Sequence, residues 1–284
     1  MGKKGKFRIG LAQMDSREDR EANLEMARRL AGEAADRGAD LVMFPETVDY
    51  IGADIPGHAC GIGSGSGIIR FFQELAREYG VYLLNGSITE RNPQGRPFNT
   101  SLLFDPAGQV IARYRKIHMF DVKIAQGPAY RESDGIQPGE EIVVARTGLA
   151  DLGFAICYDL RFGEMFRLMA RAGAQVILIP ADFTRETGQA HWEPLLRARA
   201  IENGCYIAAC GQAGEKAAFA AYGNSMVIDP WGRVLARAGE EPSVITADID
   251  LSYGEHVQDQ IPCLKNTRED IYDLACRRLK IYEE

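Results

Sequence analysis

The sequence lacks two features that would point to lipid or nucleic-acid partners. Among its 284 residues, no apolar run approaches the roughly 20 residues that a membrane-spanning helix requires. Positive charge is not in excess either: 33 Lys and Arg residues against 40 Asp and Glu residues give a formal net charge of −7. Sequence-independent binding to nucleic acid depends on a basic surface. We therefore expect neither a membrane nor a nucleic acid as partner, although a single Arg can still bind a carboxylate locally.

Cysteine is present, but not in closely spaced pairs. The six cysteines at positions 60, 157, 205, 210, 263 and 276 include no CxxC motif and no dense framework. Such spacing is typical of reduced thiols. The basic first residues lead into an expected strand and not into the apolar segment of a secretion signal. We expect a cytoplasmic protein.

Strand and helix patterns alternate along most of the chain, but hairpin-like strand pairs occur as well. Expected helices cover residues 18–37, 68–79, 162–171 and 189–203. Two related turn sequences, DPAG at 105–108 and DPWG at 229–232, join expected strands. This mixture predicts an α/β fold in which two mixed sheets are covered by helices.

No linker-like segment or shift in composition divides the chain. With 46% hydrophobic and 26% charged residues, it has the composition of a globular protein that can bury a large core. We expect one domain over residues 1–284, with its core at about 7–265 and a polar tail at about 266–284.

Three reactive side chains stand at the ends of separate expected strands. Glu46 and Lys116 each end a strand pattern, and Cys157 ends a short apolar run that leads directly into a helix pattern. Backbone N–H groups at such a strand-to-helix turn can bind a developing oxyanion. Each residue alone also fits a structural role: a helix-start carboxylate, a solvated strand end or a core thiol. Together they can form one nucleophile–base–electrophile site.

The three side chains have complementary chemistry. A Cys157 thiolate would add to a carbonyl-like carbon and form a thioester that water can hydrolyse. Glu46 would take the thiol proton and later activate water. Lys116 and the backbone N–H of Tyr158 would stabilise the oxyanion, and one such donor is commonly worth about 3 kcal/mol of barrier. This set suits hydrolysis of an amide or a nitrile with release of ammonia.

The sequence around these residues resembles the nitrilase superfamily of carbon–nitrogen hydrolases. The segments FPET at 44–47, YRKIH at 114–118 and CYDLRF at 157–162 are similar to its three signature segments and occur in the same order. The likeness extends from about residue 7 to 272 and implies a Glu46–Lys116–Cys157 triad. It also implies an αββα sandwich that dimerises into a four-layered αββα–αββα assembly. Glu132 resembles a second glutamate of the family that holds the lysine and positions substrate.

Within the superfamily, the chain most resembles the Nit branch, which includes ω-amidase and deaminated-glutathione amidase. The supporting segments include FDV at 120–122, GQAHWE at 188–193 and QIP at 260–262. The resemblance implies a substrate with a primary amide at one end and an α-keto acid carboxylate further along. We expect Arg185 to bind that carboxylate, Tyr50 and Phe183 to wall the pocket, and His118 to line or support it.

Other functions remain open at this point. An N-carbamoyl amino-acid or ureido hydrolase would need the same triad. Nitrile hydrolysis is disfavoured, because no Trp follows Cys157 as it often does in nitrilases. An intact triad also disfavours a non-catalytic binding protein. We expect no cofactor, and no metal at His191 because no second His or Cys lies at ligand spacing. The expected partners are a small amide substrate and a second copy of the chain, or more.

Overall fold

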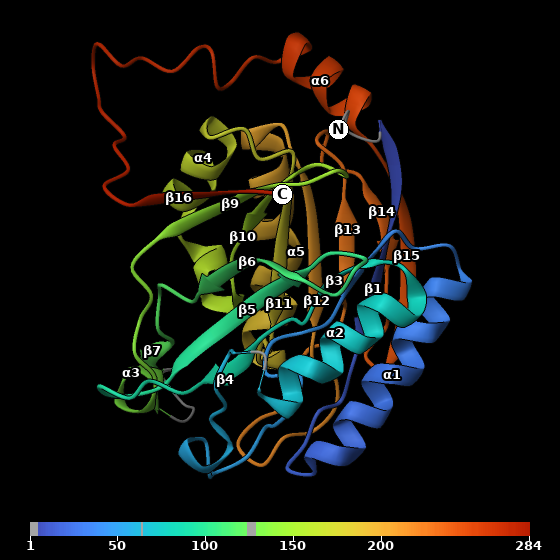
Figure 1. The fold of residues 1–284 in the computed structure, drawn as a ribbon. Helices are drawn as coiled ribbons and strands as arrows, with labels where there is room; N and C mark the ends of the chain where they lie inside the picture. Colours follow the sequence, from blue (N-terminus) through green and yellow to red (C-terminus); the bar gives the residue numbers. More distant parts are fainter. Residues whose placement is uncertain (1–4, 64, 124–128) are drawn as a thin grey trace.

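The computed structural model describes residues 5–63, 65–123 and 129–284. It contains two seven-stranded mixed sheets (Figure 1). The first has the order β15-β1-β2-β3-β5-β4, with β6 also paired to β5, and the second has the order β14-β13-β12-β11-β10-β9-β16.

The strands of the first sheet are β1 (Lys6–Gln13), β2 (Leu41–Met43), β3 (Tyr82–Leu84), β4 (Ile88–Glu90), β5 (Phe98–Phe104), β6 (Val110–Arg115) and β15 (Ser243–Asp250). Those of the second are β9 (Ile142–Arg146), β10 (Asp151–Phe154), β11 (Val176–Ala181), β12 (Tyr206–Gly211), β13 (Met226–Ile228), β14 (Val234–Arg237) and β16 (Leu279–Glu283). The helices are α1 (Arg20–Asp36), α2 (Gly67–Tyr79), α3 (Glu132–Gly135), α4 (Gly163–Arg171), α5 (Arg185–Asn203) and α6 (Leu251–Gln260). Two short 3₁₀ helices, η1 (Pro56–His58) and η2 (Cys157–Arg161), and a separate hairpin of β7 (Asp121–Lys123) and β8 (Ala129–Arg131) complete the set.

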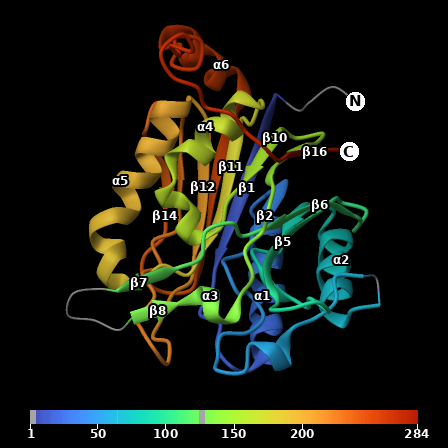
Figure 2. The same cartoon turned by 90° about the vertical axis from the view of Figure 1, so that its left-hand side faces the viewer.

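The layers follow the order helix, sheet, sheet, helix. Helices α1 and α2 pack on the first sheet, and α4 and α5 pack on the second, so that the two sheets face each other (Figure 2). The predicted αββα sandwich of two mixed sheets is confirmed.

Strand β2 is apolar throughout because both of its faces are buried. Leu41 and Met43 belong to the apolar cluster that fills the space between the sheets and continues under α4 and α5, whereas Val42 and, directly after the strand, Phe44 belong to the cluster under α1 and α2. Successive side chains of a strand point to opposite faces, and here both faces are covered. Burial of each such side chain contributes about 1.5–3 kcal/mol.

The two turns predicted from the DPxG sequences are present. Gly108 N–H donates to Asp105 O at 2.8 Å, and Gly232 N–H donates to Asp229 O at 2.9 Å. Both glycines have positive φ, 74° and 87°, a conformation that costs little only for glycine. The turns join β5 to β6 and β13 to β14.

Other boundaries differ from expectation. The chain end is not only a polar tail, because β16 pairs in parallel with β9 and Tyr82 Oη donates to Glu284 at 2.8 Å. Helix α5 begins at Arg185, four residues before the expected start at 189, because Thr184 caps it by accepting from Thr187 N–H. The hairpin of β7 and β8, α3 and α6 were not predicted.

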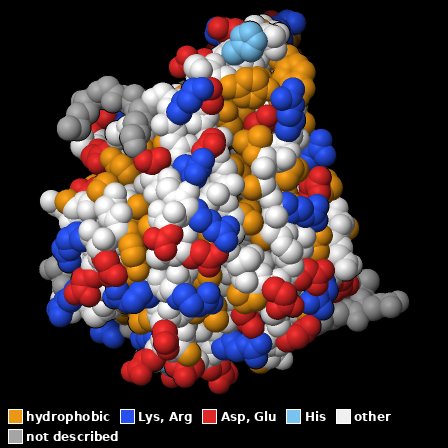
Figure 3. Space-filling view, turned by 90° about the vertical axis from the view of Figure 1, so that its right-hand side faces the viewer, with side chains coloured by type: hydrophobic (Ala, Val, Ile, Leu, Met, Phe, Trp, Pro, Cys, Tyr) orange, Lys and Arg blue, Asp and Glu red, His pale blue; other side chains and the backbone are white. Residues whose placement is uncertain are grey.

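The face drawn in Figure 3 carries charges of both signs. Lys and Arg side chains alternate there with Asp and Glu and form no continuous basic area, in line with the absence of excess positive charge in the sequence. None of the helices in the described ranges combines the length and apolar character that crossing a membrane requires. All six cysteines are free.

Candidate active site

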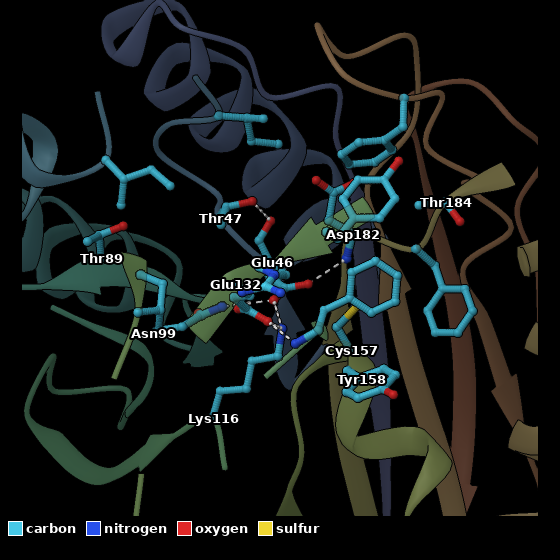
Figure 4. Close-up of a pocket in the computed structure, with 18 of the residues that line it drawn as sticks. Glu46, Thr47, Thr89, Asn99, Lys116, Glu132, Cys157, Tyr158, Asp182 and Thr184 are labelled. Carbon is cyan, nitrogen blue, oxygen red and sulfur yellow. Dashed lines mark hydrogen bonds and ion pairs between the residues drawn. The ribbon is translucent and has the colours of Figure 1, made fainter. Parts of the chain in front are cut away.

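The three residues expected to react meet at one cavity of about 370 Å³ (Figure 4). Glu46 follows β2 and Lys116 follows β6, so both come from the first sheet. Cys157 follows β10 and opens η2, so it comes from the second sheet. Glu132 opens α3 and also lines the cavity. The site therefore lies where the two sheets meet.

Lys116 is held between two carboxylates. Its Nζ lies 2.9 Å from Glu46 Oε1 and 2.8 Å from Glu132 Oε2, and its side chain is 2% exposed. Burial opposes the charged form, but the negative charges of Glu132 and Glu46 outweigh it and raise the pKa of Lys116 well above its usual value. The lysine is therefore a fixed cation and not a proton acceptor at neutral pH.

Glu46 is fixed by donors on both oxygens. Besides Lys116, Asn99 Nδ2 donates to Oε1 at 2.8 Å, and the backbone N–H of Asp182 donates to Oε2 at 2.8 Å. Gln212 Nε2 donates to the backbone carbonyl of Glu46 at 2.9 Å. The donors from Lys116, Asn99 and Asp182 thus fix the orientation of this carboxylate before substrate arrives.

Glycine is required beside the Glu46 segment. Gly86 has a φ of 70°, and a Cβ there would lie 1.9 Å from the carbonyl oxygen of Pro45. That close approach lets the chain between β3 and β4 pass directly under the segment that carries Glu46.

Cys157 adopts an uncommon backbone conformation, with a φ of 47°. Positive φ in a residue other than glycine stores strain and occurs often at functional sites. The residue is 7% exposed. Burial and then the negative charge of Glu46 raise the pKa of the thiol well above its usual value, while Lys116 acts in the opposite direction. The resting sulfur is protonated at neutral pH, and a base is needed to activate it.

Asp159 ties the cysteine segment to the lysine segment. Its carboxylate accepts from Ile156 N–H at 2.8 Å, from Tyr114 Oη at 2.6 Å and from His118 N–H at 3.0 Å. Tyr114 and His118 flank Lys116 in the chain, two residues to either side. This fully buried carboxylate therefore holds the start of η2 against the end of β6.

The expected substrate-binding residues divide into two groups. Tyr50, Phe183 and Tyr158 line the cavity. His118 does not: its ring stacks on Phe162 with centroids 3.6 Å apart, and its Nδ1 lies 2.7 Å from Asp159. Its role in the structure is to support the site, not to line it.

Arg185 is also outside the cavity lining. As the first residue of α5, it forms ion pairs with Glu215 at 3.1 Å and Glu240 at 3.5 Å, and not with its neighbour Glu186. Its guanidinium is thus occupied by carboxylates of the protein itself. The expectation that Arg185 faces a substrate carboxylate does not fit this placement.

Several cavity residues were missed by sequence reasoning. They come from several elements and the segments between them: Asn99 from β5, Tyr130 and Arg131 from β8, Thr187 from α5, and Phe120, Asp182 and Phe219 from outside the helices and strands. Arg131 is an exposed cation that ends β8, one residue before Glu132. The one available signal was a polar residue directly after a buried strand, as at Asp182. Within the described ranges, no group of three or more His, Cys, Asp or Glu side chains has a metal-holding arrangement.

Comparison with known proteins gives consistent relatives. The chain is 39% identical to the Omega-amidase NIT2 of Xenopus tropicalis, over 95% of this chain and 98% of that protein. It is 36% identical to the Omega-amidase NIT2 of Homo sapiens, over 96% and 99% respectively. Among solved structures, Nit3 of Saccharomyces cerevisiae superposes with a TM-score of 0.86 at 30% identity, covering 95% of this chain and 99% of that one.

Two further matches concern the fold and the chemistry. The NitFhit protein of C. elegans superposes with a TM-score of 0.90 at 35% identity, and the match covers 98% of this chain and 68% of that one. A variant of the amidase from Nesterenkonia sp. AN1, with a TM-score of 0.79 at 28% identity and coverage of 93% and 98%, carries acrylamide added to its active-site cysteine. The family model for carbon–nitrogen hydrolases matches residues 8–259. The chain therefore belongs to the carbon–nitrogen hydrolase family of the nitrilase superfamily and is a hydrolase that acts on carbon–nitrogen bonds.

Proposed function

We propose that this protein is a cysteine-dependent amidohydrolase that cleaves the terminal amide of a small carboxylate-bearing substrate and releases ammonia. One observation carries the proposal: a buried thiol, a fixed carboxylate and a fixed ammonium line the same cavity. The relatives named as omega-amidases support the choice of an amide.

In the first half-reaction, Glu46 takes the proton of the Cys157 thiol as sulfur attacks the amide carbon. The carbonyl oxygen becomes an oxyanion, which Lys116 and the backbone N–H of Tyr158 stabilise. Glu46 then returns the proton to the amide nitrogen, the carbon–nitrogen bond breaks, and ammonia leaves. The product on the enzyme is a thioester.

In the second half-reaction, Glu46 removes a proton from water, and the hydroxide attacks the thioester carbon. The carbon–sulfur bond breaks, the acid is released, and the sulfur regains a proton from Glu46. Amide plus water thus gives acid plus ammonia. Glu132 acts through Lys116, which it keeps charged and directed into the cavity.

The other end of the substrate meets an apolar wall and one cation. Tyr50, Phe183, Phe120 and Tyr130 supply aromatic surface around the cavity. Of the two cations among the described lining residues, Lys116 is paired with Glu46 and Glu132 and Arg131 is not, and we assign the substrate carboxylate to Arg131. An ω-amide of an α-keto acid has the required two ends. Homodimer formation and a cytoplasmic location stay predictions of the sequence.

A substrate panel tests the proposal. Purified protein is assayed for ammonia release from α-ketoglutaramate, deaminated glutathione, N-carbamoyl amino acids and simple nitriles. We expect the ω-amides to be the best substrates and Cys157→Ala to abolish release. Carbon dioxide appearing with the ammonia would instead identify an N-carbamoyl hydrolase. No acyl adduct on Cys157 by mass spectrometry with any member of the panel would contradict the thioester route.

A further inference from the structure

Asp182 is an acidic residue of the cavity that the reaction above does not use. It directly follows β11, lines the cavity and is partly exposed there. Its Oδ1 is buried and has no hydrogen-bond partner among the described residues. A buried acceptor without a donor costs about 1–3 kcal/mol, so such atoms call for an explanation. A ligand that brings a donor would supply one.

The main chain of Asp182 touches both reacting groups. Its N–H donates to Glu46 Oε2 at 2.8 Å (Figure 4). The same main chain also acts on the thiol of Cys157, whose pKa it lowers against the larger effects of burial and of Glu46. The side chain therefore starts beside the atoms at which the carbon–nitrogen bond would break.

The polar atoms near Glu46 that lack a hydrogen-bond partner are acceptors. Lys116 Nζ donates to Glu46 and Glu132, and Asn99 Nδ2 donates to Glu46. Asn99 Oδ1, on the amide whose nitrogen donates to Glu46 Oε1, is a second buried atom without a partner among the described residues. A ligand group with N–H donors can pair with these acceptor oxygens, and a ligand group that has acceptors alone cannot.

Asp182 is sensitive to such a donor. Burial raises its pKa to about 7, Lys216 opposes this shift, and the charge of Glu46 adds to it. Near neutral pH the carboxyl is thus present in both forms, and a nearby donor favours the ionised form. The charged and titratable groups that act on it are Lys216, Glu46, Lys116 and Asp15, with the thiol of Cys157 at its main chain and Tyr130 within range.

We propose that Asp182 is a specificity-determining residue that accepts a hydrogen bond from the nitrogen of the substrate's scissile amide. The inference rests on the proposed function, which places that nitrogen beside Glu46 during attack by Cys157. It defines the substrate class as primary amides and carbamoyl groups, which carry N–H donors, in preference to esters of the same acid, which carry none.

The test compares an amide with the methyl ester of the same acid. Asp182→Ala should lower kcat/KM for the amide by about 10–100-fold, the range for a hydrogen bond to a charged group, and that for the ester by less than about threefold. Asp182→Asn keeps an acceptor oxygen and should give an intermediate loss. Glu186→Ala, which removes an exposed carboxylate outside the cavity lining, is the matched control and should leave both substrates unchanged. Equal effects on amide and ester, or none on either, would overturn the proposal.

A binding measurement separates this inference from the proposed function. In a Cys157→Ala background, calorimetry with the intact amide and the intact ester needs no turnover. Addition of Asp182→Asn or Asp182→Ala should weaken binding of the amide and leave that of the ester. If the wild type released no ammonia from any amide, the proposed function would fail, and this binding comparison would still decide the role of Asp182.

Discussion

The ammonium of Lys116 lies 2.9 Å from the carboxylate of Glu46, although 70 residues separate them in the chain. The same ammonium also donates a hydrogen bond to the carboxylate of Glu132 at 2.8 Å. Two anions around one cation explain how a lysine stays charged while buried, and they assign different tasks to the two glutamates. Glu46 reaches both the lysine and the thiol, whereas Glu132 reaches the lysine.

Removal of the charge of Glu132 should therefore disturb Lys116. Glu132→Gln takes away the largest contribution that raises the lysine pKa, so that pKa should fall, and Nζ loses one of its two anchors. We expect kcat/KM to fall by about 10²-fold, the loss typical of a displacement of about 1 Å. Steady-state kinetics across pH would measure it. Glu164→Gln, which changes an exposed glutamate, is the control, and equal kinetics in the two variants would contradict the role of Glu132.

Glu46→Gln should change thiol reactivity and turnover in opposite directions. The charge of Glu46 raises the pKa of Cys157, so its removal lowers that pKa and increases the thiolate fraction at a given pH. Alkylation of Cys157 by iodoacetamide at pH 8 should become faster. Amide turnover should fall by about 10²–10⁴-fold, because the proton carrier is gone. A parallel loss of both rates would contradict this prediction, because it would show that proton transfer to Glu46 also controls alkylation and outweighs the change in thiol pKa.

The two arginines give a direct comparison of carboxylate binding. Arg131→Ala should raise KM for an acid-bearing amide by about tenfold, the scale of one charged hydrogen bond. Arg185→Ala should change KM by less than about twofold, because that guanidinium already pairs with Glu215 and Glu240 outside the cavity. An uncharged amide of similar length serves as control substrate. A larger effect at Arg185 would restore the expectation drawn from the sequence.

Asp182 should make the free energy of unfolding depend on pH. Its folded-state pKa of about 7 lies above the ordinary aspartate value of 3.8, so the folded protein binds the proton more tightly. The contribution to stability is fully present below pH 4 and is lost as pH rises through about 7. Asp182→Asn should match the wild type near pH 4 and exceed it by up to about 4 kcal/mol at pH 8. Urea unfolding at several pH values would measure this, and a pH-independent difference would refute it.

Substitution of Gly86 and of Gly80 distinguishes the cost of a steric clash from the cost of a positive φ. Both have positive φ, 70° and 63°, but a Cβ at Gly86 would meet Pro45 O, whereas nothing lies within 4 Å at Gly80. Gly80→Ala should cost about 1–2 kcal/mol, the penalty of the conformation alone. Gly86→Ala should cost more than that and should also lower kcat, because it displaces the segment that holds Glu46. Thermal unfolding and kinetics of both variants provide the check.

The sequence was informative where the signal is local. The turns at Asp105 and Asp229 depend on neighbouring residues, and the alternation of helix and strand patterns predicted two mixed sheets covered by helices. The αββα layer order was implied by the family resemblance. The meeting of Glu46, Lys116 and Cys157 at one cavity was expected from their segments taken together, which resemble a known family.

Long-range pairing was not visible in the residue pattern. Asn99 lies beside Lys116 because β5 pairs antiparallel with β6, and Lys116 N–H donates to Asn99 O at 2.9 Å just beyond that pairing. The order β2-β3-β5 in the same sheet brings Asn99 to Glu46, which follows β2. Such a register depends on how whole sheets assemble. The same holds for β16 beside β9 and for Arg185, whose partners Glu215 and Glu240 come from distant loops.

The reacting groups come from different sheets: carboxylate and ammonium from one, sulfur from the other. A displacement of one sheet relative to the other would therefore change the distance between the sulfur of Cys157 and the carboxylate of Glu46. Apolar side chains with no access to substrate, such as Met43 between the sheets, thereby act as spacers for the reaction. Trimming such a spacer would slow turnover in molecules that remain fully folded.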